Sequence, residues 1–127
     1  HILGTTGGRE DHTLGNISLL MEYTRNIGNP IAPFNNIMHE GISVDIVTDN
    51  GIFTPHYNSF EKGCRAGQQI SIISFDNTIR MKSKGLRYPT DNATFEFWWS
   101  GTLNEAEGES FSLEFSHSAP VLLFMLY

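Results

Sequence analysis

Two different hydrophobic patterns divide the chain near residues 28–30. In the first part, six positions recur at spacings of three and four, as on the buried face of an α-helix. They are Leu14, Ile17, Leu20, Met21, Thr24 and Ile27. Asp11 stands where an acidic capping or first-turn residue is favoured, and Pro30 cannot continue a helix. The pattern therefore predicts one amphipathic helix between Asp11 and the triplet Gly28-Asn29-Pro30.

After residue 30, apolar side chains alternate with polar ones, which is typical of half-buried β-strands. The segments with a strand pattern are 42–46, 52–57, 69–75, 78–82, 94–99, 111–115 and 121–126. Turn signals separate them, among them Asp76-Asn77 and the type I′ hairpin signal Asp49-Asn50-Gly51, and Pro55 is expected at a sheet edge or strand end. The last segment is continuously apolar, as in a central strand buried on both faces. About seven short strands of this kind predict a β-sandwich.

The N-terminal part has the order of a strand, a glycine-rich loop and a helix, which is the repeating unit of an α/β sheet. Residues 1–4 read as the strand and residues 4–9 as the loop. We therefore expect a mainly β fold, in which an antiparallel β-sandwich follows a strand–loop–helix remnant of an α/β domain. Residues 1–30 are expected to form the C-terminal end of that domain, and residues 31–127 the sandwich domain. The chain does not begin with Met, so we expect a fragment or a processed terminus.

Composition narrows the class of protein. The chain has 14 acidic and 8 basic residues and a net charge of -6, a balance that disfavours binding to nucleic acid or to an anionic membrane. The single cysteine, Cys64, excludes an intramolecular disulfide and a Cys-rich zinc site. The longest apolar run, 121–127, is far shorter than the roughly 20 residues of a membrane helix. We expect a cytoplasmic protein whose partners include neither nucleic acid nor membrane.

The glycine-rich loop is the segment richest in chemistry. Gly7 and Gly8 let backbone N–H groups approach an anion, and the helix start behind them adds a positive dipole. Arg9 can hold phosphate oxygens, and Asp11 can ligate Mg²⁺. The same residues also suit a tight turn, a solvated cation and a helix cap, and their spacing matches neither a P-loop nor a dinucleotide fingerprint. Taken by itself, the spacing favours the purely structural interpretation.

Aromatic residues form a second candidate. Trp98-Trp99 and Tyr88 can stack on a flat ligand, whereas alternation favours the sandwich core for Phe95 and Phe97. Residues 85–89 read as a strand that ends in a loop, so Tyr88 is expected to be partly exposed. Residues 101–105 read as a short polar connection, whose composition suits a turn as well as a ligand contact.

Together these segments resemble the thiamine pyrophosphokinase family. Residues 3–12, Leu-Gly-Thr-Thr-Gly-Gly-Arg-Glu-Asp-His, are similar to the family's Gly-Gly-Arg-x-Asp-His/Gln signature with its preceding strand and following helix. Residues 85–89, Gly-Leu-Arg-Tyr-Pro, are similar to the family's Gly-Leu-Lys-(Tyr/Trp) motif. Asn104-Glu105 follows at the family's distance, as does a closing apolar strand after His117. The order and spacing of these motifs agree over nearly the whole chain.

The resemblance implies an enzyme that transfers diphosphate from ATP to the hydroxyl of thiamine with Mg²⁺, giving thiamine diphosphate and AMP. It implies that Gly7, Gly8 and Arg9 bind the nucleotide phosphates. Arg9 and Asp11 would be the catalytic pair, with Asp11 also a metal ligand.

The resemblance also implies a homodimer with thiamine bound at the subunit boundary. Tyr88 stands where the family places the aromatic residue that stacks on the thiamine pyrimidine from the partner subunit. Thr102 and Asn104 stand in the loop that lines the same pocket.

Two departures from the family pattern leave an alternative open. Leu103 occupies a position where the family usually has Ser, which removes one polar contact to thiamine. The family's acidic metal-binding cluster lies upstream of the Gly-Gly-Arg signature, outside this sequence, so the chain is expected to be the C-terminal portion of a longer protein. The alternative is a non-catalytic thiamine-binding or regulatory module. A structural or carbohydrate-binding sandwich is a third interpretation, supported only by the strand count and the aromatic residues.

Overall fold

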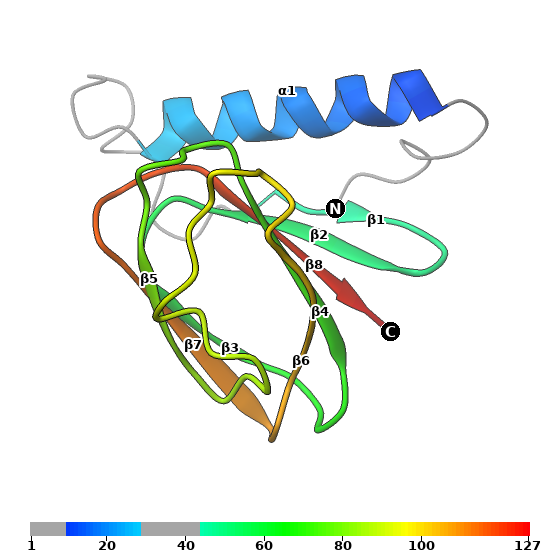
Figure 1. Ribbon diagram of the computed structural model, residues 1–127. Coiled ribbons are helices and arrows are strands. Elements are labelled where there is room, and N and C mark those ends of the chain that lie inside the picture. Colours follow the sequence, from blue (N-terminus) through cyan, green and yellow to red (C-terminus); the bar gives the residue numbers. More distant parts are fainter. Residues whose placement is uncertain (1–9, 29–43) are drawn as a thin grey trace.

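The computed structural model describes residues 10–28 and 44–127 (Figure 1). This part of the chain contains one helix, α1 (Glu10–Gly28), followed by eight strands. The strands are β1 (Ile46–Val47), β2 (Gly51–His56), β3 (Phe60–Gly63), β4 (Gln69–Ser74), β5 (Met81–Lys84), β6 (Gly101–Glu105), β7 (Ser110–Phe115) and β8 (Val121–Leu126).

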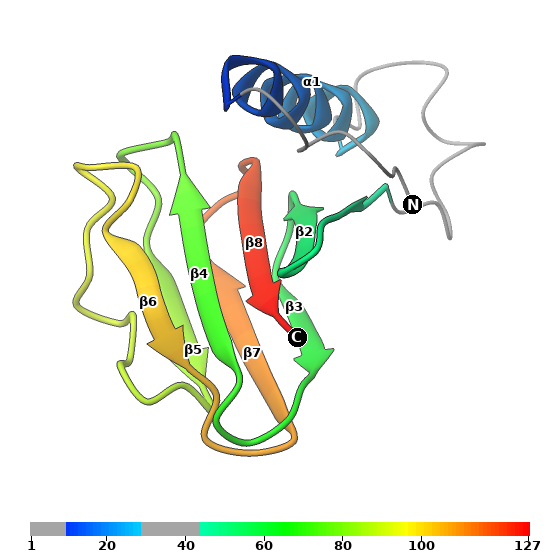
Figure 2. The same ribbon diagram turned by 90° about the vertical axis from the view of Figure 1, so that its right-hand side faces the viewer.

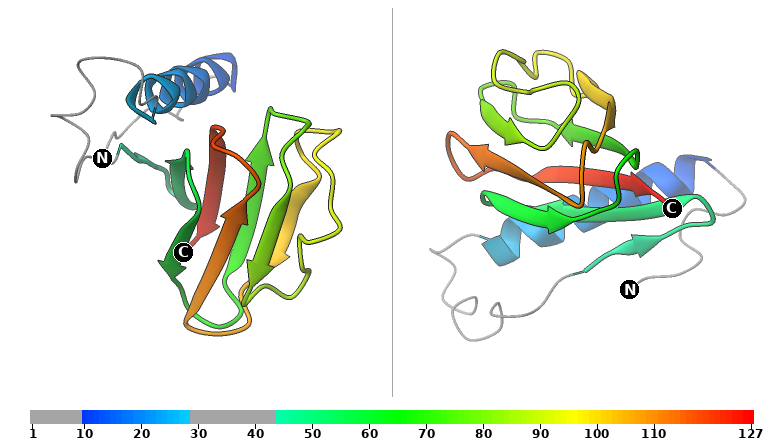
Figure 3. Two further views of the ribbon diagram at one scale, coloured as in Figure 1. Left: turned by 90° about the vertical axis from the view of Figure 1, so that its left-hand side faces the viewer. Right: turned by 90° about the horizontal axis from the view of Figure 1, so that it is seen from below.

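The strands form two antiparallel sheets that face one another. The larger sheet has the order β1-β2-β8-β4-β6 and the smaller one β3-β7-β5. Figure 2 shows the larger sheet in front of the smaller, and Figure 3 shows β7 from the opposite side, between β3 and β5. β8 pairs with β2 on one side and with β4 on the other, the central position that its apolar sequence predicts. The predicted mainly β fold with an antiparallel sandwich is thus confirmed.

The main core fills the space between the two sheets. β8 contributes Val121, Leu123 and Met125 to it, and β7 contributes Phe111 and Leu113. These residues alternate with outward-facing ones along each strand, as the period of two requires. Leu122 lies on the opposite face of the larger sheet, where it belongs to a second, smaller cluster.

The second cluster joins α1 to the outer face of the larger sheet. Leu20 and Met21 of the helix pack with Ile46 and Leu122, and Ile17 is partly buried beside them. Leu14 is 66% exposed, so its predicted place on the buried face is wrong. The helix contacts the sheet around residues 17–21, and residue 14, one turn closer to its N-terminus, lies outside that contact.

The rest of the N-terminal predictions fall largely outside the described part of the chain. Thr24 and Ile27 have side chains outside it, as do the predicted strand and loop at residues 1–9. The division into domains at residue 30 therefore stays a prediction. Among the described residues, no helix combines the length and the hydropathy needed to cross a membrane.

A hairpin joins β1 to β2 where it was predicted, but its turn is not type I′. That turn requires a positive φ at both central residues, and the described residues with positive φ are Leu103, Gly67 and Gly85. Instead, the Thr48 hydroxyl accepts hydrogen bonds from the N–H groups of Asn50, at 3.2 Å, and Gly51, at 3.1 Å. Gly51 is needed for another reason, because a Cβ there would lie 2.2 Å from the Met125 carbonyl oxygen of β8.

Pro55 lies at a sheet edge within the described part of the chain, as predicted. β1 pairs with residues 52 and 53 of β2, and no other described strand lies on the β1 side of Pro55. A proline is tolerated there because none of the described strands needs its missing N–H group.

The predicted strand at 94–99 is wrong, and the strand lies instead at β6, which was expected to be a connection. Residues 94–97 are irregular and bent, and turns follow, in which the Ser100 N–H donates to the Phe97 carbonyl oxygen at 3.0 Å and the Thr102 N–H to that of Trp99 at 3.0 Å. Phe95 is buried as expected, but Phe97 is exposed together with both tryptophans. Gly101 then enters the sheet, where a Cβ would lie 2.7 Å from the Ile72 carbonyl oxygen.

Candidate functional site

The residues predicted to handle the nucleotide lie at the start of α1. Asp11 is exposed in the first turn of the helix, and its Oδ1 accepts a hydrogen bond from the His12 N–H at 2.9 Å. Gly7, Gly8 and Arg9 lie outside the described residues. Within residues 10–28 and 44–127, no group of three or more His, Cys, Asp or Glu side chains is placed to hold a metal ion. The catalytic and metal-binding roles of Asp11 and the phosphate-binding loop therefore stay predictions.

Two of the predicted thiamine contacts are brought together. Asn104, on β6, is 6% exposed, and its side-chain amide meets the backbone of Tyr88. Asn104 Oδ1 accepts from the Tyr88 N–H at 3.1 Å, and Asn104 Nδ2 donates to the Tyr88 carbonyl oxygen at 2.8 Å. The same Oδ1 accepts the Glu105 N–H at 2.9 Å. A buried amide satisfied in this way fixes the Tyr88 backbone against the edge of the larger sheet.

The Tyr88 ring extends from this anchor into solvent. It is 56% exposed, and the guanidinium carbon of Arg87 lies over the ring, 5.5 Å from its centroid. Arg87 Nη1 donates to Glu105 Oε2 at 2.9 Å. That hydrogen bond, followed by the nearby Tyr88, raises the pKa of Arg87 above its ordinary value. Sequence reasoning placed Tyr88 in an exposed loop correctly but did not identify Arg87 and Glu105 as its neighbours.

Thr102 and Leu103 lie on a β-bulge of β6, where it pairs with β4. Ile70 pairs with Asn104 and Ile72 with Gly101, so the single residue Ser71 faces both Thr102 and Leu103. Leu103 has a φ of 62° and is 83% exposed. A leucine in this left-handed conformation is strained by about 1–2 kcal/mol. Such strain concentrates at functional sites, and here it lies between the two predicted contact residues of β6.

Four half-exposed aromatic rings precede the bulge. Phe75 stacks on Trp98 with centroids 6.0 Å apart, and Phe97 stacks on Trp99 at 5.5 Å. The Ser74 N–H donates to the Trp98 carbonyl oxygen at 3.3 Å, which ties this segment to the end of β4. The two tryptophans therefore stack on different phenylalanines, and Phe75 is a member that the sequence pattern did not identify.

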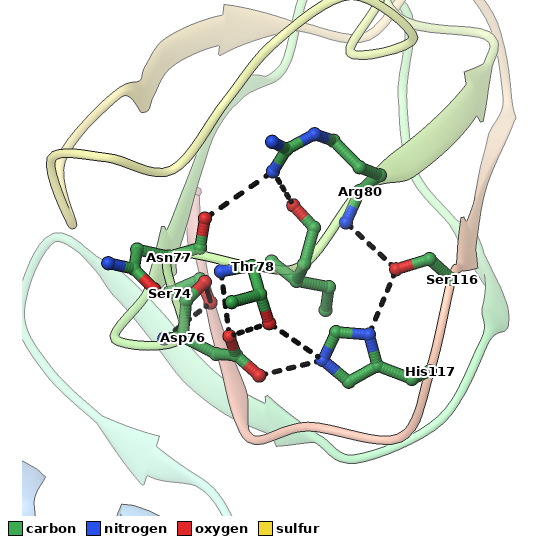
Figure 4. A network of polar contacts seen from close by, with 8 residues as sticks. Ser74, Asp76, Asn77, Thr78, Arg80, Ser116 and His117 are labelled. Carbon is green, nitrogen blue, oxygen red and sulfur yellow. Dashed lines mark hydrogen bonds and ion pairs between the residues drawn. The ribbon is translucent and has the colours of Figure 1, made fainter.

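A polar network links the β4–β5 turn to the β7–β8 loop (Figure 4). Asp76 Oδ1 accepts from the Thr78 N–H at 2.8 Å and from its hydroxyl at 2.6 Å, and Asp76 Oδ2 lies 2.7 Å from His117 Nε2. The hydrogen bonds from Thr78, and then from His117, lower the pKa of Asp76 to about 2. Ser116 extends the network, with its Oγ 3.1 Å from His117 Nδ1 and accepting the Arg80 N–H at 2.9 Å. These contacts hold together two loops that each connect the larger sheet to the smaller one.

His56 is a half-buried histidine at the end of β2. Its ring stacks on Phe60 at 3.6 Å between centroids, and its Nε2 has no hydrogen-bond partner among the described residues. Burial, together with the nearby Lys62, lowers the pKa of His56 to about 4. The ring is therefore neutral at physiological pH and serves packing.

Comparisons with known proteins agree with this arrangement. The solved thiamine pyrophosphokinase of Bacillus subtilis is 22% identical, with a TM-score of 0.68 over 97% of this chain and 52% of that one. The enzyme of Candida albicans is 19% identical, with a TM-score of 0.74 over 98% and 42% of the two chains. That of Geobacillus thermodenitrificans is 25% identical, with a TM-score of 0.65 over 98% and 51%. The chain thus spans about half the length of these proteins, and the likeness shows a shared fold.

A search of curated protein sequences finds no match. Among protein families, the one described as "Thiamin pyrophosphokinase, substrate-binding domain" matches residues 51–124, the segment that runs from β2 into β8 and includes Tyr88 and Asn104. Because this match covers more than half of the sequence, the chain belongs to the thiamin pyrophosphokinase family, within its substrate-binding domain.

Proposed function

We propose that the protein is a thiamine pyrophosphokinase, which transfers diphosphate from ATP to the hydroxyl of thiamine and releases AMP. The observation that carries this proposal is the exposed Tyr88 ring, held by Asn104 within the segment that matches the family's substrate-binding domain. A flat aromatic face anchored at its backbone suits a flat heteroaromatic substrate.

In this proposal, thiamine is bound by Tyr88, Thr102 and Asn104. The Tyr88 ring stacks on the pyrimidine ring, and Thr102 and Asn104 line the same pocket from β6. Thiamine carries a positive charge, so the net charge of -6 favours its approach.

Diphosphate transfer is assigned to the start of α1 and the loop before it. The oxygen of the thiamine hydroxyl attacks the β-phosphorus of ATP and its proton is released to solvent. The bond between the β-phosphorus and the oxygen that bridges it to the α-phosphorus breaks, and AMP leaves with that oxygen. Such transfers depend mainly on positioning and charge neutralisation. We assign these tasks to Gly7, Gly8 and Arg9 for the phosphates, and to Asp11 with Arg9 as the catalytic pair.

Mg²⁺ is the metal implied for this reaction. The Asp11 carboxylate is a hard oxygen ligand of the kind that Mg²⁺ prefers, but the described residues contain no group of three or more His, Cys, Asp or Glu side chains placed to hold a metal ion. Bound at this place, Mg²⁺ would neutralise phosphate charge. We assign no further step to it.

A homodimer with thiamine at the subunit boundary is part of the proposal. In such a dimer, Tyr88 of one subunit stacks on the thiamine bound to the other. The exposure of Tyr88, Trp98 and Trp99 supports it, because half-exposed rings of this size gain free energy when a partner covers them. The acidic balance and the single Cys64 support a cytoplasmic location.

A second candidate is a thiamine-binding or regulatory module without catalysis. Leu103 favours it, because an 83% exposed apolar side chain stands on the bulge where the family usually has Ser. Catalysis and binding alone differ in one measurable respect, the appearance of AMP.

The test is turnover of thiamine, ATP and Mg²⁺ by the full-length protein, followed as AMP and thiamine diphosphate. Turnover that falls with Arg9→Ala or Asp11→Ala supports the kinase. Thiamine binding by calorimetry without any product supports the module. If the protein neither binds thiamine nor turns it over, both candidate functions are overturned.

A further inference from the structure

Two neighbouring residues, 87–88, are bound by two neighbouring residues of β6, 104–105. The Asn104 amide binds the backbone of Tyr88, and the Glu105 carboxylate binds the side chain of Arg87. The backbones are also joined, because the Arg87 N–H donates to the Glu105 carbonyl oxygen at 2.9 Å. Once these contacts form, the chief freedom left to Tyr88 is the rotation of its side chain.

Arg87 restricts that rotation. Its guanidinium lies over the Tyr88 ring, where a cation is attracted by the negative π-face. An exposed arginine alone would sample many rotamers, but Glu105 holds this one by a hydrogen bond of 2.9 Å. The planar guanidinium keeps both contacts at once, which a lysine ammonium does less well.

We infer that Arg87, fixed by Glu105, is a positioning residue that occupies one face of the Tyr88 ring and leaves the opposite face to a flat ring of the substrate. This inference rests on the proposed function, in which that substrate is thiamine. Arg87 then acts through Tyr88: it fixes the ring in the orientation that stacking needs and prevents a ligand from stacking on the wrong side.

A double-mutant cycle tests this dependence. In the full-length protein, Arg87→Met is expected to raise the KM for thiamine about two- to fivefold, the range of an exposed cation–π contact, with kcat unchanged. Arg87→Lys is expected to restore part of the loss, and Glu105→Gln to raise the KM in the same direction by a smaller factor. In a Tyr88→Leu background, Arg87→Met is expected to change the KM no further.

Lys84→Met is the matched control, because it removes an exposed positive charge from β5 that takes no part in the contacts described above between residues 87–88 and 104–105. It is expected to leave the thiamine KM unchanged. The positioning role is overturned if the effects of Arg87→Met and Tyr88→Leu on the free energy that corresponds to the thiamine KM are additive. It is also overturned if Lys84→Met raises the KM as much as Arg87→Met does.

A measurement without thiamine separates this inference from the proposed function. In the NMR spectrum of the ligand-free protein, nuclear Overhauser contacts are expected between the Arg87 side chain and the Tyr88 ring protons, and they should weaken in Glu105→Gln. Absence of these contacts in the wild-type protein overturns the inference even if thiamine is turned over. A wild-type protein that shows the contacts but does not bind thiamine instead overturns the proposed function.

Discussion

The side-chain amide of Asn104 both donates to and accepts from the backbone of Tyr88, across 16 residues of sequence. This pairing uses a buried side chain to place an exposed one. A residue that the family motif suggests for substrate contact therefore also has a structural task in this chain, and the two tasks can be separated by experiment.

Asn104→Asp keeps the shape of the side chain but removes the Nδ2 donor and brings a carboxylate toward the Tyr88 carbonyl oxygen. We expect the free energy of unfolding to fall by about 1–3 kcal/mol, the cost of a buried polar group left unsatisfied. Urea denaturation measures it. Thr102→Val, on the same strand but partly exposed, is the control and should change stability by less than about 0.5 kcal/mol. Equal effects of the two variants would contradict the anchoring role.

Leu103→Asn should stabilise the fold. Asn tolerates the left-handed conformation better than Leu does, so we expect a gain of about 0.5–1 kcal/mol in thermal or urea unfolding. Leu103→Ala removes the exposed side chain but keeps the unfavourable φ, and it should have little effect. A gain from Ala as large as that from Asn would show that exposed apolar surface, rather than backbone strain, is the cost.

Tyr88→Ala should weaken thiamine binding up to about tenfold, because the stacking face is lost. Its urea midpoint should match that of the wild-type protein, since the ring lies in solvent and the anchor is in the backbone. Tyr88→Phe keeps the face and should bind thiamine normally in calorimetry. Unchanged affinity in Tyr88→Ala would remove Tyr88 from the binding site.

His56 should make the fold sensitive to mild acid. Its pKa is about 4 in the folded protein and 6.5 as the ordinary value, so the unfolded chain takes up the proton first as the pH falls. The stability that neutral His56 supports is complete above pH 6.5 and is lost between about 6.5 and about 4, by at most about 3 kcal/mol. Urea midpoints across this range measure the loss. His56→Phe, which keeps the stack on Phe60, should flatten the profile, and an unchanged slope would exclude His56 as its source.

Asp76 should act in a separate, more acidic window. Its pKa is lowered from 3.8 to about 2 in the folded protein, so its contribution is present above pH 3.8 and is lost as the pH falls through about 2. Asp76→Asn should therefore lower the urea midpoint at neutral pH and make little difference near pH 2. A deficit of the same size at both pH values would mean that the ionised carboxylate is not what stabilises the two loops.

The long, regular patterns of the sequence predicted the fold well. The helix between Asp11 and Gly28 was predicted from spacings of three and four, and the central strand at 121–126 from an unbroken apolar run, and both elements are confirmed. Segment 94–99 alternates clearly, yet of its four rings only that of Phe95 lies in the core. Alternation predicts which side chains share a face only if the backbone is extended. Here the backbone is not extended, because the N–H groups of Ser100 and Thr102 make hydrogen bonds within local turns.

The site was predicted in part, because motifs identify residues but not their contacts. Tyr88 was expected in an exposed loop and lies there. Its hydrogen bonds to Asn104, and those of Asp76 to His117, join residues far apart in the chain through pairings that no local pattern contains. The positive φ of Leu103 was equally hidden, since nothing in its neighbours marks a bulge at a position normally suited to Gly or Asn.

The place of β8 has a consequence for how the protein is made. β8 is the middle strand of the larger sheet, and it follows both of its neighbours, β2 and β4, in the sequence. The larger sheet therefore closes only once residues 121–126 have been synthesised, and until then β2 and β4 expose unpaired edges that must be kept from other chains.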